Sequence, residues 1–152
     1  DTEDIDALQF ERLIRAALDD ATPPDVSRAR CHEALGLWRG TPFGDLADVD
    51  PFRLEALRLD ELRMVAMETQ LEAELALHHP ELVIGALESA VQENPYRERL
   101  WYLLIEALSR EGRRREALEA CSRLRTTLGE VGLEGGPRLA ELEDRIVQGV
   151  DV

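Results

Sequence analysis

Apolar residues recur at helical spacing along almost the whole chain. Between Asp6 and Ala21 they are separated by three and four residues, and the segment opens with the pattern of a capping box. After a Pro-Pro break, Asp25 is placed to cap a second helix that stops at Gly40. The first forty residues therefore predict a pair of amphipathic helices.

A long helix is predicted from Pro51 to about Leu77, after the Gly, Pro and Asp-rich loop GTPFGDLADVD at 40–50. Its apolar residues fall on two opposite sides. One side carries Leu59, Leu62, Ala66, Ala73 and Leu77, and the other carries Leu57, Met64, Leu71 and Leu75. Such a pattern is typical of a helix packed between neighbours rather than on a surface.

Four more helices follow the same period. The fourth ends near Asn94 and Pro95, a turn at Gly112 separates the fifth from the sixth, and a seventh follows the break GLEGGP. No segment alternates convincingly with a period of two, so we expect no strands. The sequence predicts an all-α fold of about seven helices.

A weak internal repeat relates the later helices. Glu81 and Glu116 open similar helices 35 residues apart, close to the 34-residue period of tetratricopeptide repeats. The large and small positions of that motif match best at Trp101, Leu104, Leu108, Ala117, Cys121 and Leu124. We therefore expect stacked antiparallel helical hairpins.

The charge balance narrows the class of partner. The 152 residues contain 32 acidic and 18 basic residues, all of the latter Arg, for a net charge of −14. Nucleic-acid binding normally needs a basic stripe, so we expect protein partners and no direct DNA binding by this chain. The absence of Lys, beside abundant Arg and Ala, is typical of GC-rich coding sequences. No apolar run is long enough to span a bilayer, which favours a cytoplasmic location.

Four segments in order resemble the bacterial transcriptional activator domain of the Streptomyces antibiotic regulatory protein family. They are ALGLWRGTPFGDL (34–46), PFRLEALRLDELRMVAMETQLEAELAL (51–77), NPYRERLWYLLIEALSREGRRREAL (94–118) and GLEGGPRLAELEDRI (132–146). The resemblance implies a single domain over 1–152, with an N-terminal helical pair and loop (1–50) and tetratricopeptide-like hairpins (51–150).

The same resemblance implies a function in transcription. In this family the helical domain follows a winged-helix DNA-binding domain, which is absent here, and the chain begins at Asp1 without Met. We therefore expect a fragment that supports dimerisation and contacts with the transcription machinery, including RNA polymerase subunits, while DNA is read elsewhere. Two alternatives stay open: a helical-repeat adaptor unrelated to transcription, and a domain that senses a small molecule between its helices.

Candidate interaction residues lie at the starts of two predicted helices. Arg97, Arg99, Trp101 and Tyr102 open the fifth helix, where stacked hairpins usually present a binding groove. Arg113, Arg114 and Arg115 form the one compact basic run. Against these roles, the arginines are also suited to pairing with nearby Glu residues, and Trp101 to the core.

Catalysis and cofactor binding are not expected. No Ser lies in a strand-to-helix elbow, and the glycines near 129–136 lack the Lys of a phosphate-binding loop. The acidic loop at 45–50 lacks EF-hand spacing, and His78 and His79 have no further His or Cys nearby in the sequence. Cys31 and Cys121 are expected to be buried thiols.

Overall fold

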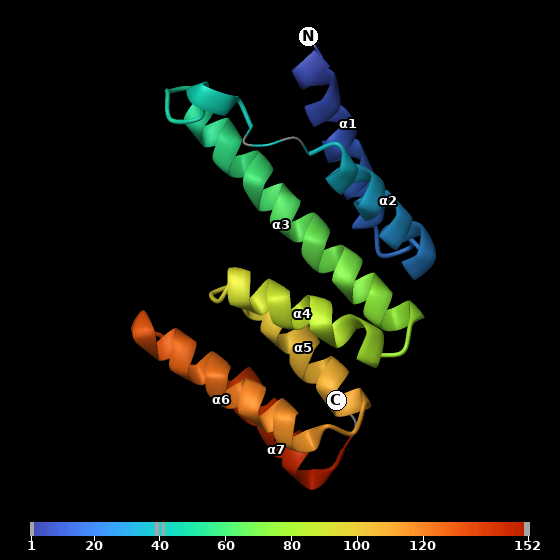
Figure 1. Ribbon diagram of the computed structural model, residues 1–152, viewed down its shortest axis with the longest axis vertical. Coiled ribbons are helices and arrows are strands. Elements are labelled where there is room, and N and C mark those ends of the chain that lie inside the picture. The colour runs from blue at the N-terminus through green and yellow to red at the C-terminus, as the bar shows by residue number, and fades with distance from the viewer. Residues whose placement is uncertain (1, 39, 41, 151–152) are drawn as a thin grey trace. The chain divides into compact units, whose positions relative to one another are not determined.

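The computed structural model describes residues 2–38, 40 and 42–150, and all regular structure in this part of the chain is helical (Figure 1). The elements are α1 (Thr2–Ala17), α2 (Pro24–Gly36), a short 3-10 helix η1 (Gly44–Leu46), α3 (Phe52–Leu77), α4 (Glu81–Glu93), α5 (Glu98–Arg110), α6 (Arg114–Glu130) and α7 (Gly136–Gln148). This confirms the predicted all-α class and its seven helices.

The chain divides into two compact units, 1–77 and 78–152, called here the N-terminal and C-terminal units. The first holds α1 to α3 and the second holds α4 to α7. The long helix α3 thus belongs with the two helices before it, whereas the sequence grouped it with the later hairpins. That residues 1–152 form a single domain stays a prediction.

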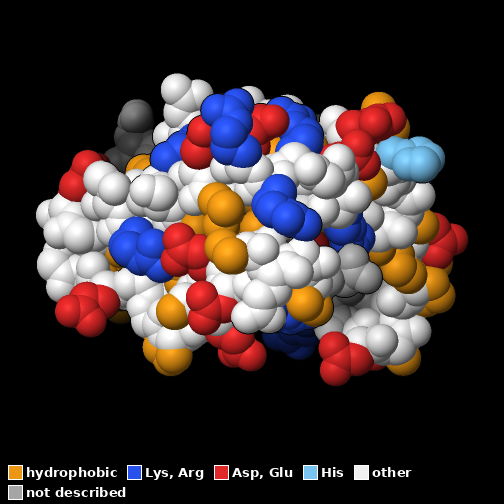
Figure 2. Space-filling view, turned by 90° about the horizontal axis from the view of Figure 1, so that it is seen from below, with side chains coloured by type: hydrophobic (Ala, Val, Ile, Leu, Met, Phe, Trp, Pro, Cys, Tyr) orange, Lys and Arg blue, Asp and Glu red, His pale blue; other side chains and the backbone are white. Residues whose placement is uncertain are grey.

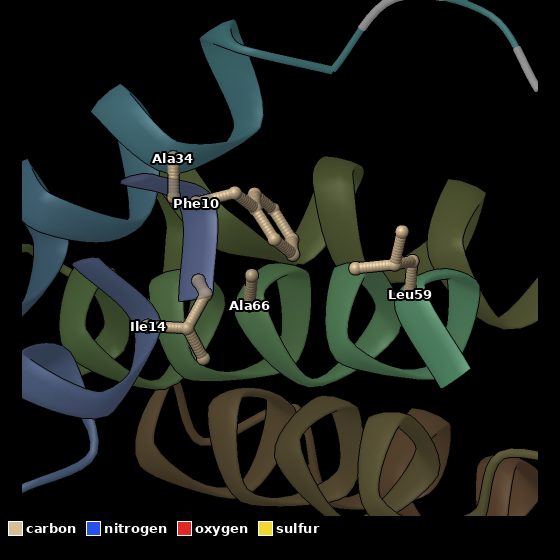
Figure 3. Close-up of a cluster of buried hydrophobic side chains, with 5 residues drawn as sticks. All are labelled: Phe10, Ile14, Ala34, Leu59 and Ala66. Atoms are coloured by element: carbon tan, nitrogen blue, oxygen red, sulfur yellow. The ribbon is translucent and has the colours of Figure 1, made fainter. Parts of the chain in front are cut away.

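In the N-terminal unit, α2 packs against both α1 and α3, and α1 also contacts α3. Figure 3 shows side chains from all three helices directed into one apolar cluster, namely Phe10, Ile14, Ala34, Leu59 and Ala66. The buried positions of α2 itself are Ser27, Cys31 and Ala34. These side chains are small, so the helix backbones can approach closely.

Side chains that follow α1 bind the carbonyl groups at its end. Thr22 Oγ1 donates to the Ala16 carbonyl at 2.8 Å, Arg30 Nη1 donates to the same oxygen at 2.9 Å, and Ser27 Oγ donates to the Ala17 carbonyl at 2.9 Å. The last carbonyls of a helix lack partners within the helix. These hydrogen bonds therefore satisfy the C-terminal end of α1 and fix it to α2.

The first two helix starts differ from prediction. Because α1 begins at Thr2, Asp6 lies inside the helix and the predicted capping box at its start is wrong. Pro24, not Asp25, opens α2: proline needs no N–H partner at that position, and its ring already has the helical φ. Asp25 lies in the first turn, where a negative charge suits the helix dipole.

In the C-terminal unit each helix packs against the next, with α5 between α4 and α6 and with α7 on α6. The buried residues of α5 are Leu100, Trp101, Leu103, Leu104, Ile105, Ala107 and Leu108. Equivalent positions one repeat apart in α4 and α6 are also buried: Val83 and Ala117, Leu87 and Cys121, and Ala90 and Leu124. The predicted repeat thus marks the core of this unit.

Candidate protein-interaction site

Trp101 is part of the core of the C-terminal unit. Its side chain is 3% exposed, and its indole Nε1 donates a hydrogen bond to the Pro95 carbonyl at 2.8 Å. The Arg123 guanidinium lies 5.0 Å from the ring centroid and pairs with Glu88 at 3.2 Å. These contacts fix the turn before α5 and leave almost none of the indole for a partner to touch.

The neighbouring candidates are not drawn together by the fold. Tyr102 is half-buried, with the Arg138 guanidinium 4.0 Å from its ring centroid. Burial raises the pKa of the Tyr102 hydroxyl, and the positive charge of Arg138 partly opposes that rise. Arg97 is half-buried at the N-cap of α5, and Arg99 is exposed on its first turn.

The basic run at the start of α6 is divided among three different environments. Arg113 Nε donates to Glu116 at 2.9 Å, and Arg115 Nη1 donates to Glu119 at 3.0 Å. The Arg114 guanidinium instead lies against Gly149, where an added Cβ would be 2.5 Å from Nη2. Acidic and basic side chains also lie next to one another on the face shown in Figure 2. The run therefore does not act as one basic patch.

The aromatic residues around the 40–50 loop pack on the N-terminal unit. Trp38 lies 5.5 Å from Phe10 between ring centroids, and the Arg63 guanidinium lies 5.3 Å from the Trp38 ring. Phe43 and Phe52 are 5.3 Å apart. Trp38 and Phe43 both contact the apolar cluster, so they anchor the loop to the helices. Arg39 and Thr41 of the same loop lie outside the described residues.

Sequence reasoning missed an exposed apolar segment at the start of α3. This apolar segment consists of Leu46, Val49, Phe52, Leu54 and Leu57, all of them exposed. Leu54 is 73% exposed and Leu57 is 59% exposed, so the predicted burial of Leu57 is wrong, as is that of Leu77, which is 41% exposed. The two-sided pattern of α3 is confirmed further along, at Leu59, Met64, Ala66, Leu71, Ala73 and Leu75. Exposed apolar side chains that form one contiguous patch are typical of interaction sites.

An open pocket of about 530 Å³, called here the cavity, lies in the C-terminal unit, where the end of α5, the start of α6 and the end of α7 meet. Its lining residues are Ser109, Arg110, Gly112, Arg114, Ile146, Gly149 and Val150. Of these only Arg114 was a sequence candidate. The cavity is lined by segments that are far apart in the sequence, so no local motif indicates it.

Both cysteines are buried and neither forms a disulfide, as predicted. Burial raises the pKa of the Cys121 thiol to about 11, so the group stays protonated at neutral pH. Across the described residues, no three His, Cys, Asp or Glu side chains are grouped to hold a metal ion. No helix there has both the length and the apolar character needed to cross a membrane.

Comparisons with known proteins show which family this chain resembles. Residues 5–147 match the family described as the bacterial transcriptional activator domain. The regulatory protein DnrI of Streptomyces peucetius is 33% identical over 97% of this chain and 56% of its own length. The transcriptional regulatory protein EmbR of Mycobacterium tuberculosis is 40% identical over 76% of this chain and 30% of its length.

A solved structure agrees in fold. Mycobacterium tuberculosis EmbR, in complex with a low-affinity phosphopeptide, superimposes with a TM-score of 0.82 and 32% identity, over 97% of this chain and 38% of that one. The chain thus spans about half or less of the relatives it matches. The relatives are transcriptional regulators, and the family is not an enzymatic one. This chain belongs to the bacterial transcriptional activator domain family.

Proposed function

We propose that this chain is the protein-interaction and dimerisation module of a cytoplasmic transcriptional regulator, and that it supports activation through contacts with the transcription machinery. The observation that carries this proposal is the family match over residues 5–147. The net charge of −14 supports protein rather than nucleic-acid contacts for this part of the regulator, so DNA is bound by another domain.

The apolar segment at the start of α3 is the surface we assign to dimerisation, with a second copy of the chain as the occupant. A two-fold axis places the same patch opposite itself, so apolar side chains of one copy meet those of the other. Charges of both signs lie within or beside the segment, at Asp48, Asp50 and Arg53. A second copy rotated by 180° can therefore pair its opposite charges with those at the rim of the segment, although each chain carries a net negative charge.

For the transcription machinery we keep Arg97, Arg99 and Tyr102, whose side chains are at least partly exposed on one end of α5. Trp101 acts there as a positioning residue, because its indole fixes the turn from which α5 starts. Arg113, Arg114 and Arg115 remain candidates as well, although Arg113 pairs with Glu116 and Arg115 pairs with Glu119.

A separate measurement tests each of the two proposed surfaces. Analytical ultracentrifugation of the chain measures dimerisation, and capture of purified actinobacterial RNA polymerase on the immobilised chain measures the second contact. We expect Leu54→Glu with Leu57→Glu to abolish the dimer. We expect Arg97→Glu with Arg99→Glu to reduce polymerase capture at least tenfold and to leave the dimer intact.

Leu82→Glu is the matched control, because Leu82 is 70% exposed on α4 and lies in the other unit. It should change neither readout. A chain that is monomeric up to about 100 μM, or a dimer that the Leu54→Glu, Leu57→Glu double variant still forms, contradicts the dimerisation role. Failure of the unmodified chain to capture polymerase contradicts the machinery contact and favours an adaptor role.

A further inference from the structure

We infer that the C-terminal unit binds a small organic oxyanion, a carboxylate or a phosphate with a short apolar part, in the cavity between α5, α6 and α7. This inference does not depend on the proposed function. It adds a ligand site to a domain whose assigned roles concern proteins.

The cavity has the size of a small-molecule site. Its volume of about 530 Å³ falls within the roughly 300–1,000 Å³ typical of ligand pockets. Its walls come from three helix ends within one compact unit.

Two guanidinium groups supply the charge that an oxyanion needs. Arg110 lines the cavity and also pairs with Glu106 on its own helix. Arg114 lines the cavity against Gly149, and no ion pair to it occurs among the described residues. A guanidinium presents parallel N–H donors that match the two oxygens of a carboxylate or phosphate, so Arg114 is the main anchor.

The start of α6, in the same wall, also favours an acceptor ligand. Helix α6 starts at Arg114, and within the described residues no side chain caps its first turn. The first N–H groups of a helix lack internal partners and attract anions.

The rest of the wall selects the organic part. Ile146 and Val150 line the side contributed by α7 and its C-terminal turn. They offer apolar contact to a short chain beside the charged group, which disfavours a bare polyanion such as nucleic acid. A ligand held here contacts both Arg114 and the end of α7, so its binding also stabilises that helix end.

The test is an NMR titration of the ¹⁵N-labelled chain with butyrate, butyl phosphate and inorganic phosphate in separate arms. We expect saturable shifts confined to the amides of residues 109–114 and 146–150. At least one organic probe should bind more tightly than inorganic phosphate. Arg114→Gln should weaken that binding at least tenfold.

Arg115→Gln is the matched control, because Arg115 is the next residue on the same helix turn, pairs with Glu119 and does not line the cavity. Its affinity should be unchanged. If Arg114→Gln disturbs the fold of α7, Arg110→Gln carries the test with the same expected weakening.

Three results overturn the inference. The first is that no probe gives saturable amide shifts. The second is that Arg114→Gln and Arg115→Gln lower the affinity equally. The third is that the shifts occur at all arginines of the unit and not only around the cavity. A phosphoserine peptide that binds at least tenfold more tightly than butyl phosphate, with shifts beyond the cavity, would assign the pocket to a protein partner and overturn the small-molecule ligand.

Discussion

Helices α2 and α5 each pack against two neighbouring helices, but they bury side chains of very different size. In the N-terminal unit, α2 packs against α1 and α3 but buries only Ser27, Cys31 and Ala34. In the C-terminal unit, α5 packs against α4 and α6 and buries seven residues, among them Trp101 and Leu104. One interface depends on close backbone approach and hydrogen bonds, the other on large apolar side chains.

This difference predicts how each unit fails. A packed aliphatic core is weakened most when a large side chain is removed, because a cavity remains. A contact between small residues is weakened most when a side chain is enlarged, because the helices must separate. Substitutions in opposite directions should therefore discriminate between the two units.

The largest effect is expected for Leu104→Ala in α5. Leu104 is fully buried, so truncation should lower the free energy of unfolding by about 2–5 kcal/mol. Urea unfolding followed by circular dichroism measures the change. Leu82→Ala on the exposed face of α4 is the control and should change it by less than about 0.5 kcal/mol. A loss below about 1 kcal/mol for Leu104→Ala would show that this core tolerates a cavity.

The second-largest loss of stability is expected when a buried side chain of the N-terminal unit is enlarged. Ala34 is fully buried in α2, and Ala34→Leu should cost about 1–3 kcal/mol because the added atoms push α2 away from its neighbours. The same urea experiment applies, with Ala29→Leu on the exposed side of α2 as the control. If both variants unfold like the parent chain, α2 is not closely packed and the comparison fails.

A smaller effect should follow loss of the hydrogen bond between Ser27 and α1. Ser27→Ala leaves the Ala17 carbonyl without that donor and should cost about 1 kcal/mol. Ser89→Ala is the control, because it removes a serine hydroxyl on the exposed side of α4. Thermal unfolding of both variants gives the measurement, and equal melting temperatures would contradict a role for this bond.

The smallest effect concerns the ion pair that joins α6 to α7. Arg125 Nη2 lies 2.6 Å from Glu143 Oε2, and this hydrogen bond holds the pKa of Glu143 below its ordinary value, against the effect of burial. A lowered folded-state pKa stabilises the fold above the unfolded pKa of about 4.3, and the benefit is lost as pH falls through the folded pKa. Both side chains are partly exposed, so the benefit should be about 0.5 kcal/mol.

Glu143→Gln tests this pair. The parent chain should be more stable than the variant at pH 7, and the difference should shrink to zero as the pH is lowered below about 4. Glu141→Gln, on the exposed side of the same helix, is the control. A difference that persists unchanged at low pH would show that the charge of Glu143 does not stabilise the unit.

The helices could be predicted because their signals are local. The period of apolar residues located all seven, and the tetratricopeptide-like positions such as Leu104 and Cys121 correctly marked buried residues. Helix ends were less predictable: the capping side chains that complete α1 come from Thr22, Ser27 and Arg30. Periodicity alone also predicted burial for Leu57, because it does not show where along a helix the neighbours stop.

The candidate site was harder to predict because it depends on spatial neighbours. Arg113, Arg114 and Arg115 are adjacent in sequence but have partners on different parts of the unit. Trp101 resembles an exposed recognition aromatic in sequence and is buried in the structure. The cavity combines residues 109–114 with 146–150, a pairing that no sequence spacing indicates.

The bonds at the end of α1 also set how this part of the chain opens. Three donors from residues 22–30 bind the Ala16 and Ala17 carbonyls, so the end of α1 cannot fray without breaking contacts made by the next helix. In hydrogen-exchange terms, the last turn of α1 and the first turns of α2 should lose protection together, as one cooperative segment.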